Sequence, residues 1–157
     1  MEQAKTDAFH ADIDAKIIEF GFTVIGVFDD KNPRCPRENF MYTVGLSRFQ
    51  LPEIILSGYH KVFHPMINKL SKMAMDSGSM PLGLVDLGYM IAGADDETSR
   101  LFVQPVSNNI TIANEKALAV RRRYPNPQFV QLLWSDKVNI LPNEVAYDKI
   151  TCPQEIY

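Results

Sequence analysis

Apolar residues recur at helical spacing in two stretches of the chain, each with charged residues on the opposite side of the pattern. An apolar residue at every third or fourth position is typical of an amphipathic helix. The pattern predicts one helix over residues 6–20 and a second from His60 to about Ser77, in which Pro65 fits only in the first turn. Good helix formers predict a third helix over residues 112–124.

β-Branched and aromatic residues gather in six further runs bounded by turn residues, which is typical of strands. The runs cover residues 22–28, 40–46, 52–58, 84–92, 101–106 and 129–134. Most of these strands follow one another without a helix between them, so there are too few crossover helices for a fully parallel sheet. The sequence therefore predicts an α+β fold, in which about three helices pack on a mixed, mainly antiparallel sheet.

The length and composition favour one globular domain. The chain has 157 residues, of which 46% are apolar and 22% are charged. One hydrophobic core is enough for a chain of this size and composition. We predict a single domain over residues 1–142, followed by a C-terminal tail over residues 143–157 that is packed on the surface or partly mobile.

The charge and the absence of targeting signals narrow the location and the partners. A formal net charge of -3 opposes binding to nucleic acid, which depends on basic surface. No uncharged apolar run approaches the ~20 residues that cross a bilayer. The N-terminus also lacks the basic and apolar regions of a secretory signal. We therefore expect a cytoplasmic protein without a membrane partner, and an exposed sheet edge would allow a homodimer.

Three motifs stand out, and they read Phe40-Met-Tyr-Thr-Val-Gly-Leu46, Pro52-Glu53 and Gln131-Leu-Leu-Trp-Ser-Asp136. The residues, spacing and order of these motifs resemble those of the bacterial domain of unknown function 4262. In that family the second motif reads His-Pro-Glu and the third ends in Trp-Pro-Asp, so Leu51 replaces a His and Ser135 replaces a Pro. The resemblance implies a compact α+β domain of bacteria or their phages, and no established activity, cofactor or catalytic residue comes with it. If the family's His carried chemistry, this chain would lack it.

The first motif places two hydroxyl groups and a glycine on one predicted strand. Tyr42 and Thr43 point to opposite faces of the strand, because side chains alternate there. Gly45 marks a bulge, or a place where a ligand or another backbone comes close. The three residues either line a pocket or pack within the fold, where the hydroxyls bind buried partners.

The third motif ends the last predicted strand with three polar or aromatic candidates. Gln131 interrupts an apolar run, and a buried amide there must be hydrogen-bonded, either to a ligand or to a neighbouring loop. Trp134 could stack on a ring or bury its area under a loop. Asp136 follows the strand and is well placed to cap a turn.

Two further groups of residues carry charge or can bind metal. His60 and His64 stand four residues apart, but no Cys or Glu completes a recognised zinc spacing, so we predict neither a metal nor a cofactor. Arg122 is the centre of three consecutive arginines at the end of the third predicted helix. They either complement the helix dipole or bind an anion.

No complete catalytic constellation is present in the sequence: it contains neither a P-loop nor a Gly-x-Ser-x-Gly nucleophile motif. The first hypothesis is therefore a non-enzymatic module that binds a small anionic ligand or a protein partner. The second hypothesis is a hydrolase or transferase, in which Tyr42, Thr43, His64 and Asp136 meet in a pocket near the Tyr-Thr-Val-Gly-Leu strand. Because the net charge is negative, nucleic-acid binding is only the third hypothesis.

Overall fold

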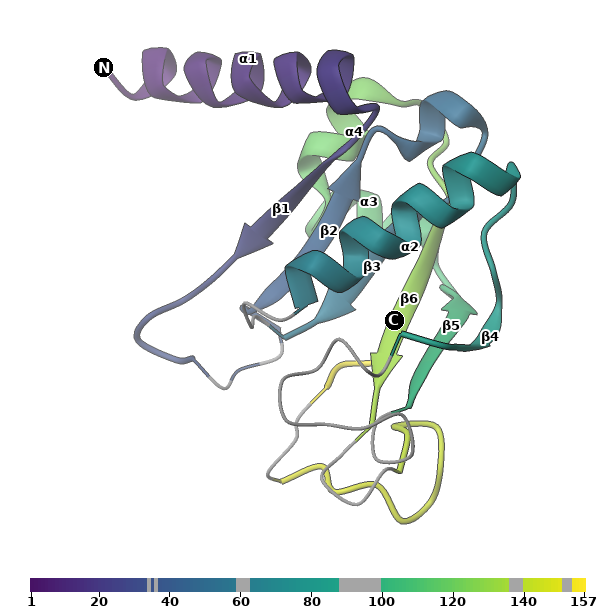
Figure 1. The fold of residues 1–157 in the computed structure, drawn as a ribbon. Helices are drawn as coiled ribbons and strands as arrows, with labels where there is room; N and C mark the ends of the chain where they lie inside the picture. The colour runs from purple at the N-terminus through teal and green to yellow at the C-terminus, as the bar shows by residue number, and fades with distance from the viewer. Residues whose placement is uncertain (34, 36, 59–62, 88–99, 136–139, 151–153) are drawn as a thin grey trace.

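The fold was analysed in a computed structural model of the chain, which describes residues 1–33, 35, 37–58, 63–87, 100–135, 140–150 and 154–157. Among these residues, six strands form one open sheet in the order β1-β2-β3-β6-β5-β4 (Figure 1). The strands are β1 (Thr23–Val27), β2 (Phe40–Val44), β3 (Glu53–Ser57), β4 (Gly83–Val85), β5 (Leu101–Pro105) and β6 (Phe129–Trp134). β3 and β6 are parallel, and every other neighbouring pair is antiparallel. The predicted α+β class with a mixed, mainly antiparallel sheet is confirmed.

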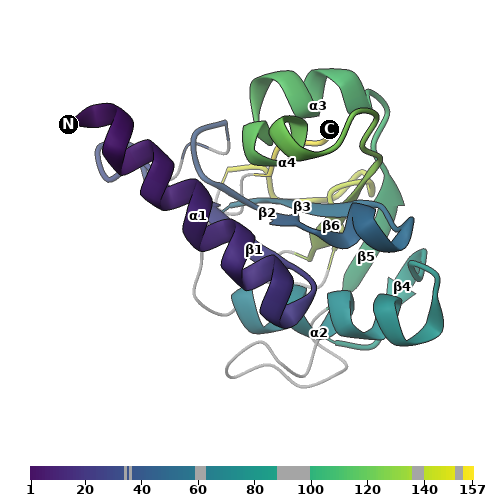
Figure 2. The ribbon, with the colours of Figure 1, turned by 90° about the horizontal axis from the view of Figure 1, so that it is seen from above.

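Helices cover both faces of this sheet. The described residues form α1 (Glu2–Phe20), α2 (Phe63–Ser77), α3 (Asn109–Glu115) and α4 (Leu118–Arg123), with a short 3₁₀ helix, η1 (Leu46–Phe49), between β2 and β3. Figure 2 shows α2 on one face of the sheet and α3 with α4 on the other, while α1 crosses the side at which β1 lies. Pro65 stands in the first turn of α2, as predicted.

The hydrophobic core consequently has two parts, one on each face of the sheet. The part under α2 includes Leu56, Met66 and Leu70, which are completely buried. The part under α1, α3 and α4 includes Ile17 and Val120. Because β2, β3 and β6 lie in the middle and contribute to both parts, their side chains are buried on both faces.

Several elements differ in extent from the sequence prediction. The single helix predicted over residues 112–124 is two helices, because the chain turns at Ala117, whose side chain is completely buried. The first of them begins earlier than predicted, since the Asn108 side chain accepts a hydrogen bond from the Thr111 backbone and caps the helix. The strand predicted over residues 40–46 ends at Val44. The strand predicted over 84–92 covers residues 83–85, and its residues from 88 onward lie outside the described ones.

The outer strands of the sheet are β1 and β4, and the homodimer through a sheet edge stays a prediction. The domain boundary at residue 142 also stays a prediction, although residues 154–157 hydrogen-bond to β3 and β6. None of the helices in the described part of the chain is long and apolar enough to cross a membrane.

Candidate functional site

The carboxylate of Glu53 is completely buried at the beginning of β3 and joins the first two motifs. Its Oε2 accepts a hydrogen bond from the Thr43 hydroxyl at 2.6 Å. Its Oε1 accepts three more, from the backbone N–H groups of Gly45 and Ser47, both at 3.0 Å, and from the Ser47 hydroxyl at 2.8 Å. The carboxylate therefore holds the turn that leads from β2 into η1.

None of the salt bridges among the described residues involves this buried carboxylate. Burial raises the pKa of Glu53, and the hydrogen bonds from Thr43, Ser47 and Gly45 oppose that rise. Thr43 is also satisfied on its other side, because its hydroxyl oxygen accepts a hydrogen bond from the Ile54 backbone at 2.8 Å. Thr43 thus serves this buried network.

Gly45 stands where another part of the backbone comes close. Its φ angle is +126°, and a Cβ atom there would lie 2.5 Å from the carbonyl oxygen of Gly21 and 2.8 Å from Cα of Phe22. Real Cβ atoms do not approach backbone so closely, so the position accepts only glycine. The close neighbour is the junction between α1 and β1.

Tyr42 and Gln131 lie on one face of the sheet, and Ile55 stands between them. The sheet register pairs Ile55 with Tyr42 on one side and with Gln131 on the other. Both side chains are buried, and burial raises the pKa of the Tyr42 hydroxyl. The Gln131 amide donates to the Glu155 carbonyl at 2.6 Å and accepts from the Tyr157 N–H at 2.9 Å. Gln131 therefore binds the end of the chain, which was one of the two predicted alternatives.

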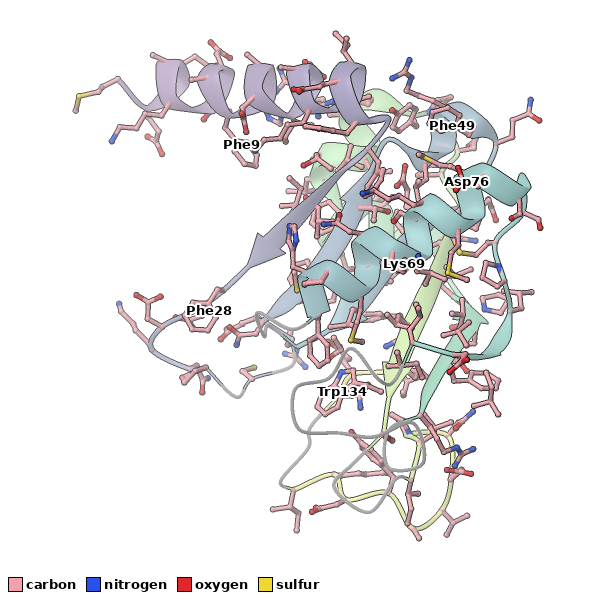
Figure 3. All side chains as sticks on the ribbon, in the orientation of Figure 1. Phe9, Phe28, Phe49, Lys69, Asp76 and Trp134 are labelled. Carbon is pink, nitrogen blue, oxygen red and sulfur yellow. The ribbon has the colours of Figure 1, made fainter. Side chains whose placement is uncertain are left out.

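Trp134 connects the end of β6 to α2 (Figure 3). Its indole N–H donates to the Ser57 carbonyl at 3.0 Å, and its ring lies 5.4 Å from the Phe63 ring, centroid to centroid. The next residue, Ser135, continues the contact with β5: its N–H donates to the Arg100 carbonyl and its hydroxyl accepts from the Arg100 N–H. Asp136 lies outside the described residues.

The remaining candidates do not join these residues. His64 is exposed on α2, and His60, four residues before it, lies outside the described residues. Arg122 is exposed on α4, whereas the neighbouring Arg123 binds Asp14 of α1 at 2.8 Å. The hydroxyls of Tyr42 and Thr43 and the ring of His64 therefore do not meet in one cleft. Within the described part of the chain, no group of three or more His, Cys, Asp and Glu side chains could hold a metal ion.

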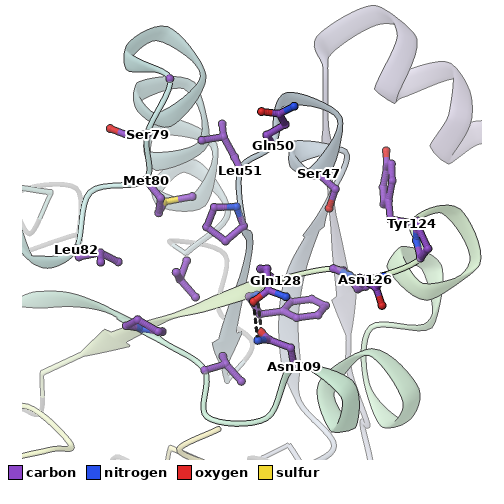
Figure 4. A pocket seen from close by; sticks show the side chains of 18 residues that line it. Ser47, Gln50, Leu51, Ser79, Met80, Leu82, Asn109, Tyr124, Asn126 and Gln128 are labelled. Atoms are coloured by element: carbon purple, nitrogen blue, oxygen red, sulfur yellow. Dashed lines mark hydrogen bonds between the residues drawn. The ribbon is translucent and has the colours of Figure 1, made fainter.

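A groove of about 700 Å³ opens at the end of the sheet where β2 ends and β3 and β6 begin (Figure 4). Its volume is within the range of about 300–1,000 Å³ that is common for ligand sites. Its polar lining consists of hydroxyls and side-chain amides: Ser47, Gln50, Ser79, Asn109, Tyr124, Asn126 and Gln128. Its apolar lining includes Leu51, Met80 and Leu82 and the prolines at 52, 105, 125 and 127. None of the described residues that line it is charged.

Hydrogen bonds orient several of these polar groups. Asn109 accepts from the Phe129 N–H at 2.8 Å and donates to Oε1 of Gln128 at 2.9 Å, so the Gln128 NH₂ is left to donate to a ligand. The Ser47 hydroxyl donates its hydrogen to Glu53 and can therefore only accept from a ligand. Burial and the charge of Glu53 raise the pKa of the Tyr124 hydroxyl, which keeps it a donor.

Gln50 stands at the rim of the groove in an uncommon backbone conformation. Its φ angle is +59°, and it is the one residue other than glycine with a positive φ among those described. Such a conformation costs a non-glycine residue about 1 kcal/mol or more, and it occurs preferentially at functional sites. The side chain of Gln50 is thus presented to the groove at a position where glycine would fit more easily.

Sequence reasoning did not find this groove, because its lining comes mostly from loops without periodic pattern. It placed Glu53 only within a motif and assigned no role to Ser47, Gln50, Tyr124 or Gln128. One signal was available: a charged residue that opens an apolar strand is buried with it and needs partners. Thr43 on the preceding strand, and Gly45 just after that strand, were the nearest candidates.

Comparison with known proteins assigns the family. The family model described as a domain of unknown function (DUF4262) matches residues 16–148, and the chain belongs to this family. The resemblance that rested on three motifs is thereby confirmed. Neither the curated proteins nor the solved structures contain a match.

Proposed function

Starting from this family membership, which carries no activity in its description, we propose that the chain is a non-enzymatic binding module that holds a protein partner. The partner inserts an extended, uncharged peptide segment into the groove where β3 and β6 begin. The observation that carries the proposal is the lining, which combines side-chain amides and hydroxyls with proline-rich apolar walls and has no charged side chain among its described residues.

This lining matches the chemistry of a peptide backbone. A backbone offers a carbonyl acceptor and an N–H donor at nearly every residue. The Gln128 NH₂ and the Tyr124 hydroxyl supply donors, and the Ser47 hydroxyl supplies an acceptor. Leu51 stands at the position where the family resemblance leads one to expect His, so the groove has an apolar contact there instead of a titratable group.

The test is a selection of displayed random peptides on the wild-type chain, followed by calorimetry with the enriched peptides. We expect Gln50→Gly and Gln128→Ala to weaken binding by about tenfold each, because each removes one or two hydrogen bonds to a ligand. Gln3→Ala is the matched control, since Gln3 is an exposed amide on α1 outside the groove. Enriched peptides that bind the two groove variants as tightly as the wild type would refute the proposal.

A hydrolase or transferase that uses Ser47 is the second candidate. One observation favours it: the Ser47 hydroxyl lies in the groove and is hydrogen-bonded at 2.8 Å to Glu53, a buried carboxylate with a raised pKa. Such a carboxylate can act as a general base toward a serine. Labelling of the wild type, but not of Ser47→Ala, by a serine-directed fluorophosphonate would favour this candidate over the binding module.

A further inference from the structure

A second hollow lies between α1, β1 and α2 and has a different character from the groove. It encloses about 350 Å³, and its lining includes Lys16 and Phe20 of α1, Thr23 of β1, and His64, Asn68 and Lys72 of α2. The three residues of α2 stand four positions apart, so they lie on one face of the helix. The sequence thus places two basic side chains and one amide of α2 opposite a third basic side chain on α1.

The charged side chains that line this hollow are all positive. Lys16 and Lys72 are basic, His64 offers a ring nitrogen, and none of the described lining residues is acidic. Lys16 pairs with Asp12 at 2.7 Å, but both side chains are about half exposed, so this pair is weak and can be exchanged for a ligand. Lys72 forms no salt bridge with any of the described residues.

His64 has a defined donor direction toward a ligand. Its Nδ1 lies 3.2 Å from the amide nitrogen of Asn68. Because that nitrogen can only donate, Nδ1 accepts, and a neutral His64 ring carries its hydrogen on Nε2. The ring can therefore donate to an anion from Nε2 while Asn68 holds the other side.

The hollow also has an aromatic rim. Phe20 is 59% exposed, although it is the last residue of a helix whose inner face is buried at Ile13 and Ile17. An exposed aromatic ring beside basic side chains suits a ligand that combines a negative group with a flat apolar group.

We propose that this hollow is a binding site for a small organic anion, namely a phosphate or carboxylate that carries an aromatic group. Lys72, Lys16 and His64 bind the anionic oxygens, and Phe20 contacts the aromatic part. The inference is independent of the proposed peptide groove, because the two share no lining residue.

The test is an NMR titration of the full ¹⁵N-labelled chain with phenyl phosphate, inorganic phosphate and benzyl alcohol. We expect phenyl phosphate to bind with a Kd of about 1 mM and to shift the backbone amides of Phe20, Thr23, Asn68 and Lys72. Inorganic phosphate should bind more weakly at the same amides. Benzyl alcohol, which has the ring without the charge, should leave them unmoved.

Variants separate a built site from general attraction to surface lysines. Lys16→Gln combined with Lys72→Gln should weaken phenyl phosphate binding by about tenfold or more, which is ~1.4 kcal/mol. The control is Lys69→Gln, because Lys69 is exposed on α2 (Figure 3) and does not line the hollow. Absent shifts at the lining amides, equal binding by the double variant and the wild type, or an equal loss in the Lys69 control would each overturn the inference.

Discussion

Replacement of Glu53 by alanine should strongly destabilise the fold, and the hydrogen bonds of the carboxylate set the magnitude. The substitution leaves the backbone N–H groups of Gly45 and Ser47 without their acceptor. A buried polar group without a partner costs about 1–3 kcal/mol. The Thr43 hydroxyl also loses its acceptor, although it still accepts from Ile54. The Ser47 hydroxyl borders the groove and can bind water instead. We therefore expect a loss of about 3–5 kcal/mol, out of a typical total of about 5–15 kcal/mol.

Glu53→Gln is the informative partner of this variant, because it keeps the shape of the side chain and one acceptor oxygen. The amide oxygen can still accept from both N–H groups, so the expected loss is only about 1 kcal/mol. The assay is urea denaturation followed by circular dichroism, with Glu115→Ala on exposed α3 surface as control, which should change stability by less than about 0.5 kcal/mol. If Glu53→Ala were as stable as Glu53→Gln, the carboxylate would not hold the turn and the reasoning would be refuted.

Three further predictions concern the same framework. Gly45→Ala should lower the free energy of unfolding by about 3 kcal/mol or more, because the new Cβ atom would lie 2.5 Å from a backbone oxygen. Gly78 also has a positive φ but lies in open space, so Gly78→Ala should cost only about 1–2 kcal/mol in the same denaturation assay. Equal losses for the two variants would contradict the steric argument. Burial raises the pKa of Glu53 above 4.5, so the folded state binds the proton more tightly than the unfolded state. This stabilisation is complete below pH 4.5 and is lost as the pH rises through the raised pKa. The wild type should therefore lose stability over that pH window relative to Glu53→Gln. If the free energies of unfolding of the two proteins ran parallel across a pH series of denaturation curves, the prediction would be wrong. Ser135→Pro removes the N–H that binds the neighbouring Arg100 carbonyl and should lower the free energy of unfolding by about 1–3 kcal/mol. Ser135→Ala keeps that N–H and should cost less. A proline variant as stable as the alanine variant would disprove the role of this hydrogen bond.

The elements of the fold were largely predictable, because most of them carry their own local pattern. The apolar spacing of α2 and the β-branched run of β1 each specify one element without help from the rest of the chain. The pairing of the strands was not predictable in the same way. The parallel contact of β3 with β6 joins Glu53 to Phe129, far apart in the sequence, and no local signal encodes it.

The break between α3 and α4 shows how tertiary packing overrides local propensity. Residues 112–124 include good helix formers, which predicted one continuous helix. In the fold, Ala117 is completely buried and Lys116 reaches back to the Arg37 carbonyl at 2.9 Å. The contacts with the rest of the domain thus accompany a turn that the helix-forming residues alone would not make.

The motif residues lie beneath the groove and hold its lining in place. The side chains of Thr43, Glu53 and Gln131 all bind other parts of the chain, so they are occupied within the fold. The same network positions the groove: the Glu53 carboxylate fixes Ser47, and the Glu53 N–H donates to the Gln128 carbonyl at 2.8 Å. Substitution of a residue that holds two walls of a groove can disturb binding as much as substitution of a residue that touches the ligand, because it moves the groups that bind. The motifs therefore identify the framework of the proposed site, and the residues that we propose contact a ligand, Gln50, Tyr124 and Gln128, lie beside them.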